Sequence, residues 1–127
     1  MRLMGIDFGA KRVGVALSDE TEHFAYPFTV LKNSEQLIHD VTKICEKERV
    51  GKIILGRSLD FKMRPNKVMK DIGEFKNELE VASGLPVDYE DEFMTSAEAE
   101  RLQGRGDKID ASAAALILKS YIDKGNH

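Results

Sequence analysis

The sequence predicts one α/β domain in which an antiparallel strand meander leads into strands that alternate with helices. Three observations support this fold class. The 127 residues suit a single domain spanning 1–127, and 42% of them are hydrophobic, which is enough for a core. Three β-prone runs open the chain in close succession. After them, apolar runs alternate with segments of helical periodicity, an order that favours right-handed parallel crossovers.

Three strands are expected in the first quarter of the chain. Arg2–Ile6 and Val13–Leu17 are short apolar runs. Gly9 lies in the turn between them and can adopt a positive φ, so the two runs should form a hairpin. Phe24–Leu31 is the third expected strand, and Pro27 favours its start or an edge position in the sheet.

A helix is expected over Asn33–Glu48, because its apolar residues recur at three- and four-residue spacing. Asn33 or Ser34 can cap the start of this helix. The apolar run Val50–Gly56 predicts a buried strand. The segment Arg57–Asn66 is polar and basic, and we expect it to be a loop.

The next helix is expected over Lys67–Ser83, where an apolar stripe again has helical spacing. Gly84 suits the position that follows the last helical turn, where a left-handed conformation is common. Leu85–Tyr89 then predicts the last strand of the sheet.

Two helices are expected to close the chain. Thr95 and Glu98 have the spacing of a capping box, so the first of them should begin there and run to about residue 103. A glycine-containing loop follows at 104–107. Asp110–Asp123 is the final helix, and its alanines would let it approach the sheet closely. The predicted order is therefore β-β-β-α-β-α-β-α-α.

Composition excludes several classes of protein. Cys45 is the only cysteine, which excludes an intramolecular disulfide and a zinc site built from several cysteines. It lies on the apolar face of a predicted helix and should be an inert core residue. The longest apolar runs fall far short of the roughly 20 residues that span a bilayer. Asp7 and Gly9 interrupt any signal-peptide core, so we expect a cytoplasmic protein.

The charge of the chain is unevenly distributed. The formal net charge is −3, which argues mildly against broad electrostatic binding of nucleic acid. Residues 57–70, however, include five basic residues and one acid, whereas residues 74–100 include nine acids and one base. This pattern allows either one basic binding face or two oppositely charged, solvated surfaces.

Carboxylates gather where strands end and where the last helix begins. Asp7 follows the first predicted strand, Glu90, Asp91 and Glu92 follow the last, and Asp110 opens the final helix. Each has a structural alternative, as a turn former, a solvated surface acid or a helix cap. The β-α order can nevertheless bring them to one edge of the sheet. No histidine or cysteine supplies other chemistry, so the chain is suited to oxygen-ligated Mg²⁺ or Mn²⁺.

Three stretches together resemble the motifs of a known family. Gly5–Ala16, Asp91–Glu98 and Ile109–Leu118 are similar to the motifs of the YqgF/RuvX family. These are Holliday junction resolvase-like proteins, also described as pre-16S rRNA nucleases, and the element order agrees along essentially the whole chain. The resemblance implies an RNase H-like fold with a five-stranded mixed sheet. It also implies a metal-dependent nuclease that acts on structured DNA or on ribosomal RNA precursors.

The same resemblance implies the site residues. Asp7, Glu92 and Asp110 would be the catalytic carboxylates and would hold one or two Mg²⁺ or Mn²⁺ ions. The partner would be nucleic acid, bound by a monomer or by a homodimer that makes paired cuts. The candidates for phosphate contacts, each with solvated surface charge as the alternative, are Lys11, Arg12, Arg57, Lys62 and Arg64.

Two departures from the family pattern leave a second function open. Phe93 stands where the family usually has an arginine, and phenylalanine cannot form a charged hydrogen bond with phosphate. After the fourth strand, Gly56–Asp60 replaces the usual Gly-Leu-Pro. The alternative is a non-catalytic module that binds nucleic acid or protein, which Phe93 and the negative net charge favour. Retention of all three carboxylates favours the nuclease.

Overall fold

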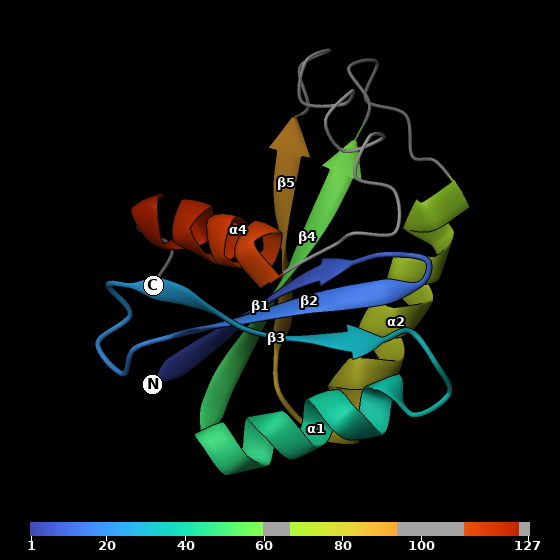
Figure 1. The fold of residues 1–127 in the computed structure, drawn as a ribbon, viewed down its shortest axis with the longest axis horizontal. Helices are drawn as coiled ribbons and strands as arrows, with labels where there is room; N and C mark the ends of the chain where they lie inside the picture. Colours follow the sequence, from blue (N-terminus) through green and yellow to red (C-terminus); the bar gives the residue numbers. More distant parts are fainter. Residues whose placement is uncertain (60–66, 94–110, 125–127) are drawn as a thin grey trace.

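A mixed five-stranded sheet lies at the centre of the computed structural model (Figure 1). The structure describes residues 1–59, 67–93 and 111–124, and only the backbone at 57–59, 67–70 and 91–93. The strands are β1 (Arg2–Phe8), β2 (Arg12–Ser18), β3 (Ala25–Lys32), β4 (Val50–Leu59) and β5 (Val87–Phe93), and the helices are α1 (Leu37–Glu48), α2 (Lys67–Ser83) and α4 (Ala111–Asp123).

The strand order is β3-β2-β1-β4-β5. β1, β2 and β3 are antiparallel neighbours, which confirms the predicted meander. β4 pairs parallel to β1, and β5 pairs parallel to β4, which confirms the predicted parallel pairing of the later strands. Pro27 lies inside β3, which is an edge strand of the sheet. A residue without an N–H is tolerated on an edge strand.

Helices cover both faces of the sheet (Figure 1). α1 and α2 pack on one face over a core that includes Met4, Ile6 and Leu55. The predicted apolar face of α1 is confirmed, and Cys45 is buried in this core. α4 packs on the opposite face, over a smaller core that includes Leu3 and Ile54.

α4 approaches β1 closely at Gly5. A Cβ atom added to Gly5 would lie 2.7 Å from the carbonyl oxygen of Ala114 and 2.8 Å from Cβ of Leu118. Both are rigid parts of the helix, so only glycine fits here. The predicted close approach of the alanine-rich helix to the sheet is confirmed, and it fixes the height of α4 above β1.

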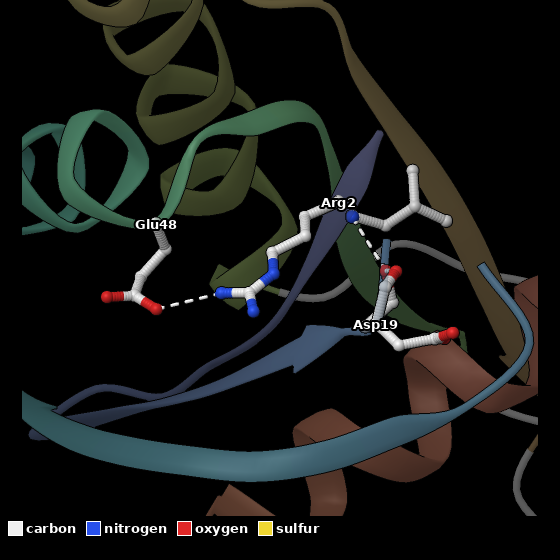
Figure 2. A network of polar contacts seen from close by, with 5 residues as sticks. Arg2, Asp19 and Glu48 are labelled. Carbon is white, nitrogen blue, oxygen red and sulfur yellow. Dashed lines mark hydrogen bonds and ion pairs between the residues drawn. The ribbon is translucent and has the colours of Figure 1, made fainter. Parts of the chain in front are cut away.

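Polar contacts anchor the start of β1 (Figure 2). The guanidinium of Arg2 donates to Oε1 of Glu48 at the end of α1, at 2.9 Å. The buried Ser18 hydroxyl accepts the N–H of Leu3 at 2.8 Å and donates to the carbonyl of Asp19. These contacts join β1 to the end of α1 on one side and to the end of β2 on the other.

Three strands are longer than the sequence predicts. β1 continues to Phe8, β4 to Leu59 and β5 to Phe93. The cause is pairing with neighbouring strands, because β1 stays in register with β2 up to Phe8 and β4 stays in register with β5 up to Phe93. The predicted loop over Arg57–Asn66 is therefore wrong at its start.

The start of α1 also differs from the prediction. The helix begins at Leu37, and its N-cap residue, Gln36, makes no side-chain cap bond. The predicted cap residue Asn33 instead donates its side-chain N–H to the carbonyl of Gly9 at 2.7 Å. The prediction of Asn33 or Ser34 as the cap is wrong because the chain is still leaving β3 at these positions.

The bounds predicted for α2 are confirmed. Gly84 has a φ of 71° and donates its N–H to the carbonyl of Glu80 at 3.0 Å, as expected for the residue that ends a helix. The predicted helix from Thr95 to residue 103, the loop 104–107 and Asp110 lie outside the described residues.

Candidate functional site

Asp7 lies within β1, directly opposite Gly14 of β2. Alternate residues of a strand point to opposite faces of the sheet, and Gly5, two positions earlier, lies under α4. Asp7 is therefore on the α4 face, and it is half-buried. The sequence placed this carboxylate after the strand, whereas pairing with β2 keeps it inside the strand.

The first turn of α4 lies towards the Asp7 end of β1. Tyr121 near the end of α4 accepts a hydrogen bond from Lys52, which is at the level of Leu3 in the sheet. Ala114, about two turns earlier in the helix, lies over Gly5. The helix therefore runs opposite to β1 (Figure 1), and its first turn is nearer to Asp7 than its last.

The acids that follow the predicted last strand lie inside β5. Glu90 pairs with Gly56 of β4, the residue that follows Leu55, and Leu55 in turn pairs with Ile6 of β1. Only 4% of the surface of Glu90 is exposed. Its Oε2 accepts from the hydroxyl of Ser120 at 2.7 Å and lies 2.6 Å from Nζ of Lys124. The charge of Glu90 is thus offset by Lys124, directly after α4, and by the hydroxyl of Ser120.

The other two predicted ligands are placed only in part. The backbone of Glu92 pairs with Ser58, two positions farther along β5 than Glu90. Asp110 precedes the first described residue of α4. Within 1–59, 67–93 and 111–124, no group of three or more His, Cys, Asp or Glu side chains is placed to hold a metal ion. Of the three predicted ligands, Asp7 alone has a described side chain.

A basic hollow of about 760 Å³ lies at the end of the β1–β2–β3 meander. Its lining includes Lys11 in the β1–β2 turn, the exposed Arg12 at the start of β2 and the exposed Lys32 at the end of β3. Lys11 and Arg12 were predicted as phosphate contacts, and Lys32 was not. Lys32 is paired with Arg12 by the register of β2 and β3, which shifts at a bulge between Val15 and Ala16.

The other predicted phosphate contacts are not brought together in the described residues. Arg57 belongs to β4, and its backbone pairs with Asp91. Lys62 and Arg64 lie outside the described part of the chain.

No described helix is long and apolar enough to cross a membrane.

Comparison with known proteins identifies the family. A family model described as RuvX: Holliday junction resolvase matches residues 1–124. A protein of Desulforudis audaxviator named "Putative pre-16S rRNA nuclease" is 36% identical over 137 residues, which cover 97% of this chain and 94% of the relative. A protein of the same name from Syntrophomonas wolfei is 33% identical and covers 99% and 96% of the two chains.

Solved structures confirm the fold. Thermus thermophilus RuvC superposes with a TM-score of 0.57 at 19% identity, over 98% of this chain and 97% of that one. Fowlpox virus resolvase, solved with its substrate Holliday junction DNA, superposes with a TM-score of 0.59 at 14% identity over the whole of both chains. The predicted RNase H-like fold is confirmed, and the chain belongs to the RuvX family of Holliday junction resolvases, which are nucleases.

Proposed function

We propose that this protein is a divalent-metal-dependent endonuclease that hydrolyses phosphodiester bonds in structured nucleic acid. The supporting observation is the position of Asp7, a half-buried carboxylate on the α4 face of the central strand, at the end of β1 towards which α4 begins. Its substrate would be the 5′ region of pre-16S rRNA, as the names of its relatives indicate, or a four-way DNA junction, as the family description indicates.

Asp7, Glu92 and Asp110 would hold the metal. Carboxylate oxygens are the donors that Mg²⁺ and Mn²⁺ prefer. When bound, such an ion supplies Lewis-acid activation of water and stabilises charge on the departing oxygen. Glu90 is not part of this set, because Ser120 and Lys124 already hold its carboxylate.

Lys11 and Arg12 would hold the substrate beside Asp7. They belong to the turn and the strand that follow β1, so β1–β2 pairing sets their distance from the carboxylate. Cationic side chains that contact phosphates fix the position of the nucleic acid without reading its sequence. Arg57, Lys62 and Arg64 are further candidates. The protein would act in the cytoplasm, as one domain, and as a dimer where paired cuts are needed.

A cleavage assay tests the proposal. Labelled four-way junction DNA and a pre-16S rRNA 5′ fragment are incubated with Mg²⁺ or Mn²⁺, and with EDTA. We expect Asp7→Asn to lower cleavage by more than about 100-fold, because even outer partners of metal ligands contribute about 10- to 100-fold. Asp123→Asn, which changes an exposed carboxylate at the other end of α4, should cleave normally.

Two results would contradict the proposed metal site. They are undiminished cleavage by Asp7→Asn and equal cleavage in the presence of EDTA. If neither substrate is cut but both are bound, the non-catalytic binding module becomes the better description. Mn²⁺ binding separates the two, since the proposed site should bind Mn²⁺ and Asp7→Asn should abolish that binding.

A further inference from the structure

Arg12 and Lys32 form a pair of like charges directly opposite each other in the sheet. They are register partners at the end of the β2–β3 ladder, and both are exposed. Like charges in directly opposed positions destabilise a sheet. Within the described residues neither side chain makes a salt bridge, and no acid lines the basic hollow between them. An anion bound here would offset the repulsion.

This pair lies on the same face of the sheet as Asp7. Val13 and Leu31 point into the core under α1 and α2, so their neighbours Arg12 and Lys32 are on the α4 face. Asp7 faces Gly14, two residues from Arg12. Strand spacings of about 4.8 Å and rises of about 3.3 Å per residue put the Cα of Arg12 about 8 Å, and that of Lys32 about 12 Å, from that of Asp7.

Asn33 holds the two sides of the hollow together. Its backbone N–H donates to the carbonyl of Lys11 at 2.9 Å, and its side-chain N–H donates to the carbonyl of Gly9 at 2.7 Å. These bonds tie the β1–β2 turn to the end of β3. The basic side chains therefore start from a backbone of fixed geometry, which lowers the cost of ordering them around a ligand.

A second hollow beside the basic one has acidic residues in its lining. It measures about 370 Å³ and shares Ala10, Asn33 and Ser34 with the basic hollow. Its lining includes the aromatic rings of Phe8 and Phe75. No described basic residue lines it, and its acidic residues are Glu35, Asp71, Glu74 and Glu78. Negative potential on this side would repel a polyanion and keep it on the α4 face.

We propose that Arg12 and Lys32 together hold a backbone phosphate of the substrate strand, adjacent to the phosphate at Asp7. Lys32 is thereby assigned as a nucleic-acid-binding residue on the edge strand. The inference rests on the proposed function, because it takes the ligand to be the same nucleic acid that reaches Asp7. The contact is to phosphate, so it applies to a DNA strand and to an RNA strand alike.

Binding measured without metal tests the contact. Fluorescence anisotropy in EDTA is used with labelled four-way junction DNA and with labelled pre-16S rRNA 5′ fragment, over a range of salt concentrations. We expect Lys32→Glu to raise Kd at least about tenfold, the effect of losing one charged hydrogen bond. The logarithm of the association constant falls as the logarithm of the salt concentration rises, and we expect this slope to become less steep by about one.

Lys43→Glu is the matched control. Lys43 is an exposed lysine on α1, on the other side of the sheet, and its substitution changes the net charge by the same amount. It should leave the salt slope unchanged. Lys32→Glu also keeps a charge on the edge strand, so a role of Lys32 in preventing edge-to-edge association would be preserved.

The results distinguish this inference from the proposed function. Equal effects of Lys32→Glu and Lys43→Glu, or an unchanged slope in Lys32→Glu, would overturn the phosphate contact. The proposed function is tested separately by Asp7→Asn. This variant should lose cleavage, while the salt dependence of its binding in EDTA should stay unchanged. A response with only one of the two probes would show which nucleic acid occupies the hollow.

Discussion

The carboxylate of Glu90 in β5 lies 2.6 Å from the ammonium nitrogen of Lys124 in the last described turn of the chain, and only 4% of Glu90 is exposed. Removing Lys124 would leave a buried negative charge with Ser120 as its described donor. We expect Lys124→Met to lower the free energy of unfolding by about 1–3 kcal/mol, measured by urea denaturation.

A salt bridge in which neither partner is buried provides the comparison. Lys76 and Glu80 form an i,i+4 salt bridge of 2.9 Å on α2, with the Glu80 side chain 36% exposed. Lys76→Met should cost less than about 0.5 kcal/mol, because solvent screens such pairs. Equal losses in the two variants would show that Lys124 does not compensate a buried charge.

The contact of Gly5 with α4 predicts a large effect from a single methyl group. In Gly5→Ala the new Cβ would meet the Ala114 carbonyl oxygen at 2.7 Å, so the helix must move away from the sheet. We expect a loss of about 1–3 kcal/mol of stability, measured by thermal and urea unfolding. Cleavage should also fall, because α4 begins towards the Asp7 end of β1, where the metal site is proposed.

Gly73→Ala is the opposite case. Nothing lies within 4 Å of a Cβ added to Gly73, which is inside α2. Alanine loses less backbone entropy in a helix, so this variant should gain about 0.5–1 kcal/mol. A loss of stability in Gly73→Ala, or none in Gly5→Ala, would contradict the packing described for these helices.

The sequence predicts the elements best where local signals agree. α2 has an apolar stripe and a terminal glycine, and its bounds are confirmed. Strand ends are predicted less well, because polar residues such as Asp7 and Glu90 indicate loops by composition. Their extended conformation comes from pairing with Gly14 and Gly56, which is information held by other parts of the chain.

The same limit applies to the candidate site. Asp7 could be identified from a carboxylate that follows an apolar run, and its face of the sheet follows from alternation. Lys32 could not be identified, because a bulge in the β2–β3 ladder sets which residue of β3 opposes Arg12. The partners of Glu90 could not be foreseen either, since Ser120 and Lys124 are brought to it only when α4 docks.

The buried thiol of Cys45 predicts a loss of stability at high pH. Burial raises the pKa of Cys45 from an ordinary value of 9.0 to about 11. Above pH 9 the unfolded chain loses this proton while the folded protein keeps it, so ionisation favours unfolding. Between pH 8 and about 10.5 the contribution should reach about 2 kcal/mol. In Cys45→Ala this part of the pH dependence should disappear, and an unchanged pH profile would contradict it.

The bond from Asn33 to Gly9 predicts an effect on both stability and binding. Asn33→Ala removes one hydrogen bond of 2.7 Å, which should cost about 0.5–1.5 kcal/mol in urea unfolding. The β1–β2 turn would then be less firmly held to β3, and the basic hollow would lose its fixed geometry. We expect Kd for labelled junction DNA in EDTA to rise several-fold, because ordering the lysines and the arginine becomes more costly. Asn77→Ala on the exposed surface of α2 is the control and should change neither quantity appreciably. Unaltered binding by Asn33→Ala would mean that the turn does not position the basic residues.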